Sequence, residues 1–117
     1  MALVSALAVG IGGAAGAVCR YTVGELLEPR ALDTLVVNVI GSLLLGLLLG
    51  ASVANLTLLA LGVGFCGAFT TFSSFAVSTI RFAEDGERRL AVVNAVGTLV
   101  LAVAGVLVGI EVGTLLA

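Results

Sequence analysis

The sequence predicts an all-α membrane protein with four transmembrane helices, the third of which is broken at mid-membrane. Of its 117 residues, 61% are hydrophobic and only 10% are charged, whereas a soluble domain carries roughly 25% charged residues. The mean hydropathy of +1.31 agrees with this bias. Such a chain cannot cover its surface with polar groups, so lipid must be its solvent.

Four apolar runs separated by short connections predict one domain, a four-helix transmembrane subunit over residues 1–117. Each run is long enough for a bilayer core, which needs about 20 helical residues. The first connection holds the only proline, Pro29, the second is a tight turn at residues 54–55, and the third is the charged hairpin RFAEDGERRL at residues 81–90. The expected helices cover about residues 2–24, 33–53, 56–82 and 89–111.

Glycines at GxxxG spacing recur in the first, second and fourth runs. In lipid, small residues let helix backbones approach closely. We interpret most of them as generic helix packing, although small-residue faces in excess of what one chain needs also suggest an oligomer. The glycines are Gly12 and Gly16, Gly46 and Gly50, and Gly105, Gly109 and Gly113.

The arginines predict the orientation in the membrane. An even number of spans puts both termini on one side and the connections at residues 20–34 and 81–90 on the other. All five arginines lie in those two connections, and the chain has no lysine. The positive-inside rule therefore places both connections in the cytoplasm and both termini outside.

Several polar side chains interrupt the apolar runs, and each needs a partner. Asn38 in the second run fits equally an interhelical hydrogen bond and a donor lining a pore. Asn94 and Thr98, spaced i, i+4, share one helix face, and Ala102 ends that polar stripe. Arg20, at the end of the first run, is expected to snorkel or to pair with an acid or with backbone carbonyls, and it can attract an anion.

The stretch GAFTTFSSF at residues 67–75 places four hydroxyls near the midpoint of the third run. Serine and threonine can bond back to i−4 carbonyls, but this explains one or two hydroxyls better than four. Glycines precede the stretch, and Thr70-Thr71 is a poor helical pair, so we expect a broken helix. Non-helical backbone at that depth must be buried in protein or line a cavity, where freed carbonyls can meet a cation and freed N–H groups an anion.

The phenylalanines of the third run allow two interpretations. Phe65, Phe69 and Phe72 have the i, i+4, i+7 spacing of an ordinary packing stripe. Alternatively, the positive edge of a phenyl ring can face an anion.

Three segments of the chain resemble the signature segments of the Fluc fluoride channels, and the likeness covers essentially the whole length. The segments are GGAAGAVCRY (residues 12–21), TLVVNVIGSLLLG (34–46) and GVGFCGAFTTFSSF (62–75). The resemblance implies a fluoride-selective channel in the plasma membrane that passively exports cytoplasmic fluoride, which enters cells as neutral HF. It also implies an antiparallel dimer with two pores near the subunit boundary and a central structural Na⁺.

The resemblance further assigns site residues in this numbering. The carbonyls of Gly67 and Thr70 would hold the Na⁺. The fourth-helix match is weaker, since Asn94 stands where the family often has an aromatic residue and Ala102 where it has a hydroxyl. The implied fluoride pathway comprises Arg20, Asn38, Phe72, Ser73, Ser74, Phe75, Asn94 and Thr98.

The arginine bias departs from one implication of the resemblance. A homodimer of antiparallel subunits must insert both ways, so its bias should be near zero. All five arginines here are on one side, and some family members form pairs of oppositely oriented partners. A heterodimer with a paralogue and a homodimer therefore both remain open.

Three rival functions follow less well from the sequence. A small multidrug-type transporter needs a membrane-embedded carboxylate, yet the first three runs have none and Glu111 lies at the end of the fourth. A non-conducting scaffold would not need Asn38 or a broken helix. An enzyme is disfavoured because the chain has no histidine and shows no nucleophile–base pair or metal-ligand set.

Overall fold

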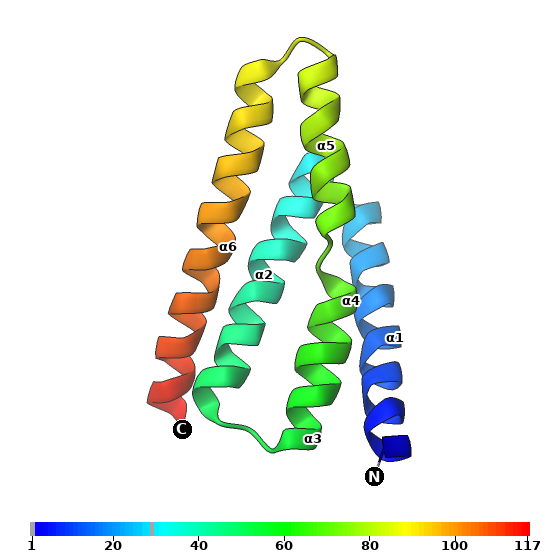
Figure 1. Ribbon diagram of the computed structural model, residues 1–117, viewed down its shortest axis with the longest axis vertical. Coiled ribbons are helices and arrows are strands. Elements are labelled where there is room, and N and C mark those ends of the chain that lie inside the picture. The colour runs from blue at the N-terminus through cyan, green and yellow to red at the C-terminus, as the bar shows by residue number, and fades with distance from the viewer. Residues whose placement is uncertain (1, 29) are drawn as a thin grey trace.

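The computed structural model describes residues 2–28 and 30–117, which form four long helical spans connected by short turns (Figure 1). The first two spans are α1 (Ala2–Leu26) and α2 (Arg30–Ala51), and the last is α6 (Arg88–Leu116). The third span is built from four consecutive pieces: α3 (Asn55–Thr57), the π-helix η1 (Leu58–Cys66), α4 (Gly67–Phe69) and α5 (Phe72–Glu84). All four spans are long and apolar enough to cross a membrane.

The helix ends differ from the expected ones by up to five residues. The second helix begins before Asp33, whose carboxylate lies in its first turn, where the helix dipole favours a negative charge. The fourth continues past Glu111 to Leu116, because one exposed carboxylate ends an apolar run without ending a helix.

The spans are arranged with α1 and α6 on opposite flanks and with α2 and the third span between them (Figure 1). The most extensive contacts join α2 to α6 and α1 to η1. Both termini lie at the same end as the turn between α2 and α3, and the α5–α6 hairpin protrudes at the other end (Figure 1). This agrees with the even number of spans expected from the sequence.

The GxxxG glycines pack helices within the chain. A Cβ on Gly12 or Gly16 would overlap backbone atoms of η1, and Gly46 lies against Gly109 where α2 meets α6. The expectation of helix packing is confirmed. Because these glycines make contacts within the chain, they are not evidence for an oligomer, which stays a prediction.

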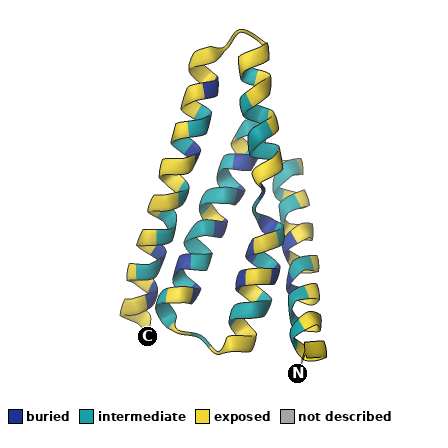
Figure 2. Cartoon of the chain, in the orientation of Figure 1, coloured by how far each residue is buried: buried dark blue, intermediate teal, exposed yellow. Residues whose placement is uncertain are grey.

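Large apolar side chains are exposed along most of the molecule, and few are buried (Figure 2). Leu3 and Ile11 of α1 are each 72% exposed, for example. In water such a surface would be a severe liability. It suits a protein whose outer faces contact lipid or a second subunit.

Candidate functional site

The third span is broken at residues 70–71, between α4 and α5, as the sequence predicts. Thr70 has φ −84° and ψ 164°, and Thr71 has φ −151° and ψ 123°, so both are extended. The Thr71 hydroxyl then accepts the N–H of Ser74 at 3.1 Å and caps the start of α5. β-branched residues fit an extended backbone, and threonine is a good N-cap. The Thr-Thr pair therefore favours both the extended backbone at residues 70–71 and the start of α5 after it.

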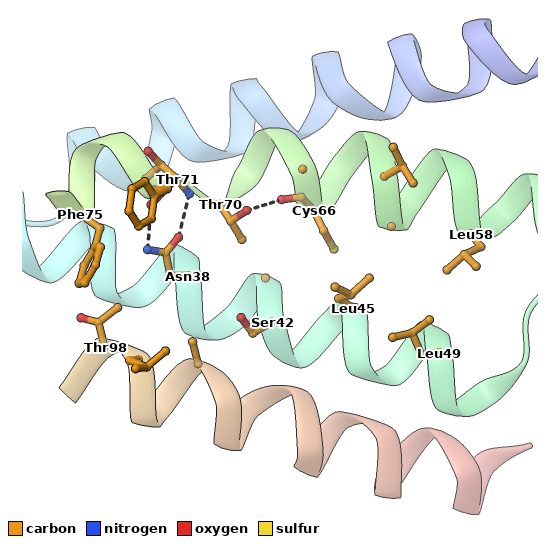
Figure 3. A pocket seen from close by; sticks show the side chains of 17 residues that line it. Asn38, Ser42, Leu45, Leu49, Leu58, Cys66, Thr70, Thr71, Phe75 and Thr98 are labelled. Carbon is orange, nitrogen blue, oxygen red and sulfur yellow. Dashed lines mark hydrogen bonds between the residues drawn. The ribbon is translucent and has the colours of Figure 1, made fainter. Parts of the chain in front are cut away.

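Asn38 holds the break open by binding the backbone of Thr71 in both directions (Figure 3). Its Nδ2 donates to the Thr71 carbonyl at 3.0 Å, and its Oδ1 accepts the Thr71 N–H at 2.8 Å. An amide side chain can replace a backbone partner in this way because it carries both a donor and an acceptor. The interhelical hydrogen bond expected for Asn38 is therefore present, and the same residue also lines a groove.

These contacts divert the donors that two carbonyls would have in an unbroken helix. The Gly67 carbonyl would accept the Thr71 N–H, but that group donates to Asn38. The Thr70 carbonyl would accept the Ser74 N–H, but that group donates to the Thr71 hydroxyl. The two carbonyls that the resemblance assigns to a cation are thus two that the break releases from their helical donors.

The four hydroxyls of the break have different partners. Only Thr70 follows the simple back-bond, donating to the Cys66 carbonyl at 2.8 Å. Ser73 lies 3.3 Å from the Thr71 hydroxyl. Arg20 donates from Nη2 to the Ser74 hydroxyl at 2.7 Å, so its partner is neither the acid nor the backbone carbonyl expected from the sequence.

A groove of about 660 Å³ lies between α2, the third span and α6 (Figure 3). Within the described parts of the chain, no charged residue lines it. Its polar side chains gather around the break, and Leu45, Leu49 and Leu58 line its other end. The predicted site residues that line this groove are Asn38, Gly67, Thr70, Phe72, Phe75 and Thr98.

Sequence reasoning missed two polar residues that line the groove. Ser42 was not considered, and Thr71 was expected at the break but not as a lining residue. Ser42 lies four residues after Asn38, so the helical period places both on one face of α2. That spacing was the available signal. Ala102 also lines the groove, where it ends the polar stripe as expected.

A second cavity, which we call the vestibule, has a volume of about 710 Å³ and lies toward the α5–α6 hairpin. Arg20, Ser73 and Ser74 line it, so three more predicted pathway residues come together here. Charged residues of both signs border it. They are Arg20, Asp33, Arg81 and Asp85. Phe72, which lines the groove, and Ser73, which lines the vestibule, are adjacent in the first turn of α5.

The phenylalanines do not form one continuous stripe. Phe65 and Phe69 stack with ring centroids 5.5 Å apart, but the break turns Phe72 away from them and leaves it 79% exposed. Phe72 instead lies 5.9 Å from Phe75, with the ring planes tilted by 53°. The packing interpretation is thus confirmed for the first pair and wrong for Phe72.

Asn94 has a different environment from the other predicted pathway residues. It lines neither the groove nor the vestibule. Its Nδ2 donates to the Thr79 hydroxyl of α5 at 2.9 Å. Asn94 and Thr98 lie on one face of α6, as expected, but only Thr98 reaches the groove.

Known proteins resemble this chain over nearly all of its length. The family described as CrcB-like protein, Camphor Resistance (CrcB), matches residues 7–110. Fluoride-specific ion channel FluC 2 of Natronomonas pharaonis is 60% identical over 116 residues, or 99% of this chain and 100% of that protein. Two proteins of Haloarcula marismortui also match. Fluoride-specific ion channel FluC 2 is 49% identical, over 91% of both chains, and FluC 1 is 46% identical, over 93% of this chain and 85% of its own.

Proposed function

The chain belongs to the CrcB-like family, whose relatives are named as ion channels rather than enzymes, and from this premise we propose that it is a subunit of a fluoride-selective channel. The observation that carries the proposal is the helix break, where amide and hydroxyl donors and two phenyl rings surround a groove that no charged residue lines within the described chain. Fluoride is small and strongly hydrated. Donors of this kind replace its water better than they replace that of larger halides, so size and donor strength act together in selectivity.

The proposed transport is passive export of cytoplasmic fluoride across the plasma membrane, which lowers fluoride toxicity. Proton-coupled export needs a carboxylate in the membrane. The carboxylates that border the path, Asp33 and Asp85, lie in the vestibule. We place the vestibule on the cytoplasmic side, because the arginine-bearing hairpin is at that end.

We propose that the conducting unit is an antiparallel dimer with two fluoride pathways. The groove is open to the side of the molecule, and Phe72 at its edge is 79% exposed. A second subunit covering this groove would complete the walls around Phe72 and Phe75. Fluoride would then pass from the vestibule along Ser73 and Ser74 to Asn38, Thr98 and the phenyl rings.

The same break provides a proposed site for a structural Na⁺. The carbonyls of Gly67 and Thr70 are released from their helical donors, and nothing lies within 4 Å of a Cβ built on Gly67. Backbone carbonyls at a helix break suit Na⁺, and a second subunit would supply a further pair.

Removal of Na⁺ is expected to destabilise the dimer, because four carbonyl dipoles would then face one another without a cation. The measurement is fluoride efflux together with the melting midpoint of the purified dimer in Na⁺ and in N-methylglucamine at equal ionic strength. Flux and midpoint that are both identical in the two buffers would rule out the Na⁺ site.

The partner in the dimer is proposed to be a paralogue of opposite arginine bias. All five arginines of this chain belong to one side, which disfavours the inverted orientation that a homodimer needs. The presence of both FluC 1 and FluC 2 in Haloarcula marismortui supports a two-gene arrangement in a relative of this chain. A homodimer is the other outcome of the same test.

The function is tested by efflux from liposomes that hold either this chain alone or the chain with an oppositely biased paralogue. We expect fluoride efflux from the co-reconstituted sample but not from the single chain. Chloride efflux from both samples should equal that of empty vesicles. Robust fluoride flux from the single chain would replace the heterodimer with a homodimer. No fluoride flux in either sample would favour a non-conducting scaffold.

A further inference from the structure

The half-helix α5 is connected to each of the other three spans by one polar side chain. From α1, Arg20 donates to Ser74 at 2.7 Å. From α2, Asn38 binds the backbone of Thr71, the N-cap of α5. From α6, Asn94 donates to Thr79 at 2.9 Å. A helix that begins at a break lacks the continuous backbone bonding that would align it with the preceding segment, so such contacts set its position.

The contact from α6 extends to the backbone of a residue that lines the groove. The Thr79 hydroxyl accepts from Asn94 Nδ2, and its single proton goes to the Phe75 carbonyl at 2.9 Å. The chain of hydrogen bonds therefore runs from Asn94 through Thr79 to the main chain of Phe75. The Phe75 ring lines the groove together with Thr98, which lies one turn along α6 from Asn94.

We propose that Asn94 and Thr79 are a positioning pair that sets the Phe75 ring against Thr98, and that Asn94 is not itself a ligand of fluoride. This inference rests on the proposed channel function. A threonine hydroxyl bonded to its i−4 carbonyl bends a helix locally, and an interhelical bond to the same hydroxyl fixes the direction of the bend. Loss of either partner frees α5 to tilt relative to α6 and changes the width of the path beside Phe75.

The pair is tested by a double-mutant cycle with Thr79→Val, Asn94→Leu and the double variant, measured as fluoride and chloride efflux in the assembly that conducts. An interhelical hydrogen bond in a membrane averages about 0.6 kcal/mol, which corresponds to about a threefold change. We expect each single variant to lower the fluoride-to-chloride ratio by about threefold, and the double variant to be no worse than the worse single variant.

Two further variants separate positioning from general structural damage. Thr79→Ser keeps the hydroxyl and is therefore expected to keep the wild-type fluoride-to-chloride ratio. Thr114→Val is the matched control, because Thr114 makes the same bond to its i−4 carbonyl at 2.7 Å on an exposed face. It is expected to leave the ratio unchanged.

The outcomes distinguish the possible failures. If Asn94→Leu lowers fluoride flux while Thr79→Val matches the wild type, Asn94 acts on the ion directly and the positioning pair is wrong. Additive effects of the two substitutions also overturn it. If the wild-type chain conducts neither alone nor with the paralogue, the proposed function fails, and hydrogen–deuterium exchange still tests the pair. Exchange over residues 72–84 should be faster in Asn94→Leu than in the wild type and unchanged in Thr114→Val. Equal rates in the wild type and both variants would contradict the positioning pair.

Discussion

Replacement of Asn38 by leucine is expected to abolish fluoride conduction and to destabilise the folded protein by about 1–3 kcal/mol. The substitution removes both hydrogen bonds to Thr71. The Thr71 N–H, in a residue that is only 9% exposed, is then left without a partner, whereas the Thr71 carbonyl keeps the first backbone bond of α5. Each buried unsatisfied group costs about 1–3 kcal/mol. Closing of the break would return the Thr71 N–H to the Gly67 carbonyl and lower this cost, but it would also remove the extended backbone that borders the groove, so conduction is lost in either case.

The measurement combines fluoride efflux with heating in the presence of a thiol-reactive dye. Cys66 is 4% exposed in the fold and reports opening of the third span, provided that the exposed Cys19 is first replaced by serine. Asn55→Leu is the matched control, since Asn55 is an exposed residue at the start of α3. Efflux and labelling midpoint within error of the control would show that the Asn38 amide does not hold the break.

Gly109→Leu is expected to separate α2 from α6 and to prevent stable folding. A Cβ at this position overlaps the Leu43 carbonyl and comes within 2.9 Å of both Gly46 and Leu47 backbone atoms. Overpacking of a tight core typically costs about 1–3 kcal/mol, and backbone cannot move aside as a side chain can. Even Gly109→Ala should lower stability, because the conflict begins at the first carbon.

Gly10→Ala is the matched control for Gly109, because nothing lies within 4 Å of a Cβ built on Gly10 in α1. Alanine stabilises a helix interior by up to about 1 kcal/mol over glycine, so this variant should label at the same temperature as the parent or slightly higher. The same thiol-labelling midpoint is measured for both variants. A midpoint for Gly109→Ala equal to that of Gly10→Ala would contradict the close α2–α6 contact.

Much of the third span could be predicted because the relevant forces are local. The Thr70-Thr71 pair disfavours a continuous helix through its own side-chain shape, and the structure breaks at those two residues. The π-helical winding of η1 was not predicted, since it has no comparable mark in the sequence. This segment contains Gly62 and Gly64, and a Cβ on Gly64 would come within 3.0 Å of the Gly13 nitrogen in α1. Its geometry thus accompanies a contact with a segment about 50 residues away.

In the candidate site, too, local spacing predicted some features and packing between helices decided others. Thr98 and Ala102 could be placed on one face of α6 from their spacing, but spacing could not show that Asn94 on that face contacts Thr79 instead of the groove. Likewise, Asn38 was recognisable as a buried amide in need of a partner. Only the packing of α2 against the third span identifies that partner as the Thr71 backbone.

The sequence by itself determined that lipid surrounds the chain, how many spans cross it and where the third span breaks. These features follow from hydropathy, run length and side-chain shape, which act over a few neighbouring residues. The tertiary structure decided which polar groups satisfy one another and which carbonyls lose their helical donors. Those choices depend on distances between different helices, which the close glycine contacts set and which no local pattern encodes. The carbonyls of Gly67 and Thr70 illustrate the difference, since they lose their helical donors to groups from Asn38 and Thr71 only in the folded chain.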